Sequence, residues 1–150
     1  MLLEREGHAM SLNRPLAGCR VLVVEDEYFI GDDLLEFLTA AGATVIGPVP
    51  RLDQALDQVR NDVFEVVILD INLRGEMSFP IADEMRRQNI PFVFVTGYHK
   101  EAIPKCFADV ERWEKPFNME YFVEATVRLR PQSRFSLQPP LQLRNKAEQR

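Results

Sequence analysis

The sequence predicts an α/β fold, a doubly wound sandwich in which a five-stranded parallel sheet lies between two layers of helices. Two observations support this. Short continuous apolar runs rich in Val, Ile and Phe alternate along the chain with segments of helical periodicity. Most runs also lack the polar–apolar alternation of a sheet with one wet face, so both faces of the strands are expected to be covered. The predicted strands are Val21–Val24, Thr44–Ile46, Val66–Leu69, Phe92–Val95 and Val110–Trp113.

Amphipathic stripes predict a helix after each of the first three strands and another after the fifth. Gly42 is a favourable residue to end the first helix, and Asn118 is suited to cap the last one. The segment Lys100–Ala108 is short and broken by Pro104, so the fourth helix is expected to be short or mobile. The stripes consist of Ile30, Leu34, Phe37, Leu38 and Ala41; Leu52, Ala55, Leu56 and Val59; Ile81, Ala82 and Met85; and Phe122, Ala125, Thr126 and Leu129.

The length of 150 residues is that of one domain. Residues 19–130 carry the alternating pattern and are predicted to form this domain. Residues 1–18 precede it as an N-terminal extension. Residues 131–150 contain Pro139-Pro140, mostly basic charges and no apolar stripe, and are predicted to form an extended or disordered C-terminal tail.

Charge and composition argue against several classes of protein. A net charge of −5 disfavours a nucleic-acid-binding surface, which normally needs a basic face. The N-terminus carries acids where a signal peptide needs cations, and the longest apolar run, Ile90–Val95, is too short to cross a bilayer. Cys19 and Cys106 lack metal-ligand spacing and indicate reduced thiols. We therefore expect a cytoplasmic protein that contacts neither nucleic acid nor membrane.

Polar residues stand where four of the predicted strands end. Because the carboxyl ends of parallel strands share one edge of a doubly wound sheet, these residues are expected to converge there. Taken singly, each has an ordinary explanation, such as a first-turn acid of a helix or a turn residue. The convergence favours a functional site. Its members are Glu25 and Asp26 after the first strand, Asp70 after the third, Thr96 after the fourth and Lys115-Pro116 after the fifth.

Grouped carboxylates raise one another's pKa unless a cation lies among them. Mg²⁺ is the predicted cation because it binds oxygen ligands, whereas Zn²⁺ favours His or Cys. With the metal bound, one carboxylate can act as a nucleophile toward phosphorus and form an aspartyl phosphate. Lys115 and the hydroxyl of Thr96 could then hold the phosphoryl oxygens.

Four motifs in this order, VLVVEDE, VVILDINL, FVFVTGY and EKPF, resemble the flavodoxin-like receiver domain of bacterial two-component response regulators. The resemblance extends from Cys19 to about Arg130. It implies that a histidine kinase or a histidine phosphotransfer protein phosphorylates the domain in a Mg²⁺-dependent reaction, and that a conformational change carries the signal. It also implies that the protein is not an enzyme beyond self-phosphorylation and autodephosphorylation.

The resemblance assigns roles to residues that match the family's motifs. Asp70 is expected to be the phosphoacceptor. Glu25 and Asp26 are expected to hold Mg²⁺ with Asp70, and the backbone carbonyl of Asn72 is expected to contribute to the same site. Glu25 stands where most receivers have Asp, and its longer arm shifts the carboxylate, so its metal contact can run through water.

The remaining motif residues are expected to bind the phosphoryl group or to modulate the site. Thr96 is the expected switch hydroxyl, and Lys115 precedes Pro116, whose peptide bond is usually cis in the family. Gly97, Tyr98, Arg112 and Pro116 are the expected modulating residues. Tyr98 would control the approach of water to the phosphoryl group. Arg112 stands where the family often has an aromatic residue that swings inward on activation. Whether Arg112 takes over this role is left open.

A narrower resemblance concerns the stretch PFVFVTGY, Pro91–Tyr98. It is similar to the motif of single-domain receivers nicknamed FAT GUY, which are common in alphaproteobacteria, with Val95 in place of the usual alanine. This resemblance implies a stand-alone response regulator of a phosphorelay, a sensor kinase of the HWE/HisKA_2 type and a role in stress response.

Two alternatives remain open, a phosphate-independent adaptor with a receiver fold and a receiver fragment of a longer regulator. A DNA-binding output would need a further domain, which the 20 residues after Arg130 cannot supply. A flavodoxin-like enzyme or electron carrier is rejected because the acidic stretch EDEYFIGDD would repel the phosphate that such proteins bind after strand one.

Overall fold

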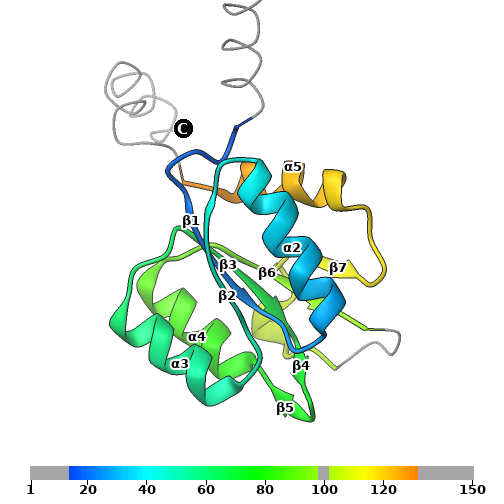
Figure 1. Ribbon diagram of the computed structural model, residues 1–150. Helices are drawn as coiled ribbons and strands as arrows, with labels where there is room; N and C mark the ends of the chain where they lie inside the picture. The colour runs from blue at the N-terminus through cyan, green and yellow to red at the C-terminus, as the bar shows by residue number, and fades with distance from the viewer. Residues whose placement is uncertain (1–13, 98–101, 132–150) are drawn as a thin grey trace, which may run out of the picture.

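The computed structural model describes residues 14–97 and 102–131, and a five-stranded parallel sheet forms its centre (Figure 1). The strand order is β2-β1-β3-β6-β7, and every neighbouring pair is parallel. This doubly wound order confirms the predicted fold class. The strands are β1 (Arg20–Val24), β2 (Thr44–Val49), β3 (Val66–Asp70), β6 (Phe92–Thr96) and β7 (Arg112–Glu114).

Helices cover both faces of the sheet (Figure 1). On one face lie α2 (Tyr28–Ala40) and α5 (Met119–Leu129), and on the other lie α3 (Leu52–Asn61) and α4 (Phe79–Gln88). The four predicted helices are therefore present. Because helices cover both faces, the carboxyl ends of the strands form the exposed edge at which side chains of separate strands can meet.

Alternate residues of the central strands enter two separate cores. Val23 of β1 joins the cluster that contains Leu34 of α2 and Phe122 of α5. Its neighbour Val24 joins the cluster that contains Val59 of α3 and residues of α4. All four residues from Val21 to Val24 are fully buried. The continuous apolar runs of the sequence thus reflect strands that are covered on both faces.

The helix termini follow the local sequence signals. The C-cap residue of α2 is Ala41, and Gly42 follows with φ +104°, a conformation that glycine adopts without strain. Asn118 caps α5, since its Oδ1 accepts a hydrogen bond from the backbone N–H of Tyr121 at 2.9 Å. Asn118 is confirmed as the N-cap of α5, whereas Gly42 follows the C-cap of α2 by one residue.

Gly31 brings the first turn of α2 close to Pro48 of β2. A Cβ atom at position 31 would lie 2.7 Å from Cγ of Pro48 and 3.7 Å from Cγ of Glu25. Only a residue without a side chain permits this approach without displacing its neighbours. The contact fixes the start of α2 beside the carboxyl end of β1, where the acidic residues follow.

The fifth strand begins later than predicted. The apolar run Val110–Trp113 indicated a strand, but β7 starts at Arg112. Val110 instead donates its backbone N–H to the carbonyl of Phe107 at 3.0 Å, which closes a turn after the 3₁₀ helix Lys105–Phe107. This three-residue helix is the helical part of residues 102–111, in agreement with a short fourth helix; residues 98–101 lie outside the described residues.

A small antiparallel hairpin follows β3 and was not predicted. It consists of β4 (Asn72–Leu73) and β5 (Glu76–Met77). Arg74 occupies its turn with φ 53°, an uncommon conformation for a residue with a side chain. The Oδ1 atom of Asn72 accepts a hydrogen bond from the backbone N–H of Gly75 at 2.6 Å and so stabilises the turn.

Residues just before β1 pack against the domain. Leu16 is fully buried, and its backbone N–H donates to the carbonyl of Ala41 at 2.8 Å. Arg130 donates to the carbonyl of Pro15 at 2.8 Å, which joins the two ends of the described chain. Most of the predicted extension and tail, residues 1–13 and 132–150, lies outside the described residues. In the described part of the chain, no helix has the length and apolar character needed to span a membrane.

Candidate functional site

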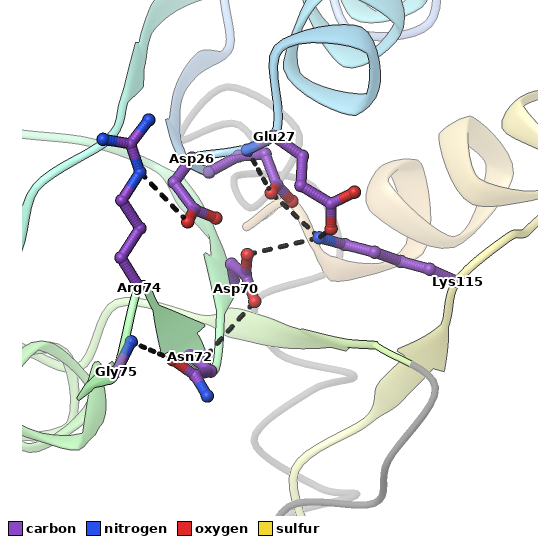
Figure 2. Close-up of polar contacts among 8 residues, drawn as sticks. Asp26, Glu27, Asp70, Asn72, Arg74, Gly75 and Lys115 are labelled. Atoms are coloured by element: carbon purple, nitrogen blue, oxygen red, sulfur yellow. Dashed lines mark hydrogen bonds and ion pairs between the residues drawn. The ribbon is translucent and has the colours of Figure 1, made fainter.

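Side chains from β1, β3 and β7 meet at the carboxyl edge of the sheet (Figure 2). Glu25 and Asp26 follow β1, Asp70 ends β3, and Lys115 follows β7. The three strands belong to one parallel sheet, so their ends share one edge, as the sequence predicted. Glu25, Asp70 and Lys115 are 2%, 4% and 8% exposed. The site is therefore a buried polar cluster.

The ammonium group of Lys115 is the centre of this cluster. Its Nζ atom lies 2.8 Å from Oε2 of Glu25 and 3.2 Å from Oδ2 of Asp70. A third carboxylate, that of Glu27, lies closest, with Oε1 2.6 Å from Nζ. An ammonium group donates three hydrogen bonds, so these carboxylates account for its full donor capacity.

Three carboxylates form a group that can accept a metal ion. One oxygen each from Glu25, Asp26 and Asp70 lies within 4.8 Å of the others. The Oε1 atom of Glu25 is buried and has no hydrogen-bond partner. A buried, unpartnered carboxylate oxygen is costly unless a cation meets it. The donor set consists of oxygen atoms, which suits a hard divalent cation.

The surroundings of Asp70 hold its pKa at about 9, far above the ordinary value. Burial is the largest cause of the raised pKa. A hydrogen bond with Glu25 and charge repulsion from it come next, and a hydrogen bond with Asp26 adds a smaller rise. The positive charge of Lys115 lowers the pKa. For Lys115, burial lowers the pKa, but hydrogen bonds to Glu25 and Glu27 and the charge of Asp70 outweigh it, so the pKa is raised. The single positive charge of Lys115 therefore does not balance the negative charges of the surrounding carboxylates.

The hairpin adds a second basic residue beside the acids. Nε of Arg74 lies 3.7 Å from Oδ2 of Asp26 (Figure 2). The Arg74 side chain is 77% exposed, whereas that of Asp26 is 12% exposed. Asn72 donates its backbone N–H to Oδ1 of Asp70 at 3.2 Å, which orients the carboxylate. The expected role of the Asn72 carbonyl in metal binding stays a prediction.

Of the other predicted residues, Thr96, Gly97 and Pro116 lie at this edge. Thr96 ends β6, is 5% exposed and accepts a backbone hydrogen bond from Lys115 at 2.8 Å. The Lys115–Pro116 bond is cis, as expected. Gly97 follows Thr96, and a Cβ atom there would meet nothing within 4 Å. Arg112 is exposed on the edge strand β7, and Tyr98 lies outside the described residues.

Two residues of the cluster had no predicted role. The sequence placed Glu27 among three consecutive acids but gave no sign that its side chain reaches Lys115, 88 positions away. The sequence gave Arg74 no role. Its contact with Asp26 depends on the turn of the hairpin, which the sequence patterns did not indicate. The run of three acids was the available signal for Glu27.

The family model of the response regulator receiver domain matches residues 21–126. The chain belongs to this family. The matched range contains one site residue from each of the four motifs, namely Glu25, Asp70, Thr96 and Lys115.

Solved receiver structures agree with this assignment. The domain is similar to the solution structure of SdrG from Sphingomonas melonis Fr1, with 37% identity and a TM-score of 0.67 over 74% of this chain and 95% of that chain. It is also similar to the BeF3-activated conformation of SdrG from Pseudomonas melonis Fr1, with 35% identity and a TM-score of 0.62 over 75% and 98% of the two chains. Because nearly all of each SdrG chain is matched, the similarity agrees with the resemblance to single-domain receivers.

Curated relatives are longer proteins. Sensory transduction protein LytT of Bacillus subtilis (strain 168) is 30% identical over 105 residues, which is 67% of this chain and 44% of LytT. LytT of Bacillus anthracis is 28% identical over 123 residues, 79% of this chain and 50% of that protein. The chain thus spans about half the length of these relatives.

Proposed function

We propose that this receiver domain accepts a phosphoryl group on Asp70 from a phosphohistidine of a sensor histidine kinase or a histidine phosphotransfer protein, and signals through a conformational change. The observation that carries the proposal is the position of Asp70. Its carboxylate is buried at the sheet edge, 3.2 Å from Nζ of Lys115 and within 4.8 Å of acidic oxygens of Glu25 and Asp26.

The proposed transfer forms one bond and breaks another. An oxygen of the Asp70 carboxylate forms a bond to phosphorus while the bond between phosphorus and the imidazole nitrogen of the donor breaks. The electron pair of that bond stays on the nitrogen, and the product is an acyl phosphate with three terminal oxygens. Lys115 can donate a charge-assisted hydrogen bond to one of these oxygens.

Glu25, Asp26 and Asp70 are the residues that would hold Mg²⁺. When bound, the ion supplies positive charge that offsets the carboxylates and the phosphoryl oxygens. Two features favour this assignment, the buried unpartnered Oε1 of Glu25 and the raised pKa of Asp70. Both indicate a cluster with more negative charge than Lys115 and Arg74 compensate.

The finer assignments rest on the family resemblance. We infer a donor kinase of the HWE/HisKA_2 type, a cytoplasmic role in stress response, and no enzymatic activity beyond self-phosphorylation and autodephosphorylation. A BeF3-activated conformation has been solved for SdrG, which supports the proposed conformational change on activation. The phosphate-independent adaptor is the alternative that the following experiment addresses.

The test uses phosphoramidate, a small-molecule analogue of phosphohistidine, with and without Mg²⁺, and a phosphate-affinity gel as the readout. The wild-type chain and Asp83→Asn, an exposed carboxylate of α4, should be phosphorylated when Mg²⁺ is present. Asp70→Asn should not react. Equal labelling of Asp70→Asn and wild type would remove Asp70 from the proposed role, and no labelling of the wild type would favour the adaptor.

A further inference from the structure

Lys115 has no free donor for a phosphoryl group in this structure. Its three contacts, to Glu27, Glu25 and Asp70, are 2.6, 2.8 and 3.2 Å long. An ammonium nitrogen carries three protons, so a new hydrogen bond to a phosphoryl oxygen requires that one carboxylate give up its own. The three carboxylates differ in what the loss of this bond would cost them.

Burial distinguishes the three carboxylates. A phosphoryl group on Asp70 takes over the contact that Asp70 makes with Lys115, so any further hydrogen bond to it must be released by Glu25 or Glu27. The Glu25 side chain is 1% exposed and would be left buried without its ion-pair partner. The Glu27 side chain is 59% exposed. Water can replace the ammonium group for Glu27, and its departure is therefore the least costly.

The position of Glu27 in the chain supports a role outside helix formation. Glu27 is the N-cap residue of α2, yet its side chain makes no capping hydrogen bond. The backbone N–H of Glu27 donates instead to Oε2 of Glu25 at 3.0 Å. The side chain of Glu27 reaches away from its own helix to Lys115, a residue of the opposite end of the domain sequence (Figure 2).

We propose that Glu27 is a positioning residue that competes with the phosphoryl group on Asp70 for Lys115. In the unmodified protein, Glu27 holds the ammonium group at the mouth of the site. When a phosphoryl group is attached, Lys115 turns to its oxygens and Glu27 moves into water. Glu27 thereby lowers the affinity of the site for the phosphoryl group. This inference rests on the proposed phosphorylation of Asp70.

The experiment measures the binding of beryllofluoride, which stands in for the phosphoryl group on a carboxylate, at saturating Mg²⁺. The variant Glu27→Gln keeps the size of the side chain and removes its charge. Because the Glu27 side chain is more than half exposed, the expected effect is modest, roughly two- to fivefold tighter binding. The difference should shrink as ionic strength rises, since exposed charges are screened.

Glu36→Gln is the matched control. Glu36 lies on the same helix and is exposed, so this variant makes the same change in net charge outside the cluster. It should bind beryllofluoride like the wild type. Equal tightening in both variants would mean that net charge acts at a distance and would overturn the competition, as would unchanged or weaker binding by Glu27→Gln. A wild-type protein that binds no beryllofluoride would refute the proposed function itself.

Discussion

Nε of Arg74 lies 3.7 Å from Oδ2 of Asp26, so a basic side chain from the hairpin faces the acids expected to hold a cation. The two positive charges of the cluster come from different parts of the fold. Arg74 belongs to the hairpin, and Lys115 follows β7. Each compensates part of the negative charge in a different place. A metal ion bound by Asp26 would compete with Arg74 for that carboxylate.

Replacing Arg74 with Ala is expected to strengthen Mg²⁺ binding about two- to fivefold, because an exposed ion pair contributes at most about 1 kcal/mol. Binding can be followed by the fluorescence of Trp113, the single tryptophan, which lies two residues before Lys115. Arg51→Ala, which removes an exposed arginine paired with Asp53, is the control and should leave the affinity unchanged. Weaker binding in Arg74→Ala would show that Arg74 supports the metal site instead.

Glu25→Gln is expected to weaken Mg²⁺ binding by roughly 10- to 100-fold, the loss typical of removing a group that supports a metal site. The reason is that Glu25 supplies the buried oxygen without a partner. Glu27→Gln is the comparison, because Glu27 touches Lys115 but is not one of the three clustered carboxylates. Similar losses in the two variants would contradict the separate roles of these neighbouring acids.

Asp70 should make the stability of the metal-free protein depend on pH. Its pKa is about 9 in the fold and about 3.9 in an unfolded chain, so the folded state binds the proton more tightly. The resulting stabilisation is complete below about pH 4 and is lost as pH rises toward 9. Asp70→Asn cannot ionise and should therefore be more stable than the wild type at alkaline pH.

We expect the free energy of unfolding of Asp70→Asn to exceed that of the wild type by about 1–3 kcal/mol at pH 9 in the presence of a chelator, with a smaller difference at pH 5. Urea denaturation at the two pH values measures this difference directly. Asp83→Asn, on the exposed face of α4, should show no such dependence. A difference that stays constant from pH 5 to pH 9 would show that Asp70 ionises normally.

Gly31→Ala tests how α2 is placed beside the site. Alanine favours a helix by about 1 kcal/mol over glycine, but its Cβ atom would lie 2.7 Å from Pro48. Overpacking costs about 1–3 kcal/mol, so we expect a net loss of about 1 kcal/mol in the free energy of unfolding. Gly97→Ala, whose Cβ atom would meet nothing within 4 Å, is the matched control. Stabilisation of Gly31→Ala would show that Pro48 yields easily.

Most of the fold was predictable because its signals are local. The buried strands β1, β3 and β6 read as uninterrupted apolar runs, and Asn118 and Gly42 mark helix ends by their own chemistry. The hairpin was missed because β4 and β5 have two residues each, too few for a period. The start of β7 was misplaced because Val110 is apolar but bonds back to a turn.

The candidate site was predictable to the same degree. The topological rule for parallel sheets was sufficient to bring Glu25, Asp70 and Lys115 to one edge. This rule does not predict where a long exposed side chain points. The contacts of Glu27 with Lys115 and of Arg74 with Asp26 depend on rotamers and on a turn conformation, and these follow only from the tertiary structure.

The most direct measurement of the central claim is the location of the phosphoryl group in the chain. The wild-type protein is treated with phosphoramidate and Mg²⁺, the acyl phosphate is cleaved reductively with borohydride, and the peptides are mapped by mass spectrometry. We predict that the reduced residue is at position 70 and that the product requires Mg²⁺. Reduction at another carboxylate, or an unmodified peptide around Asp70 in a protein that carries phosphate, would contradict the account.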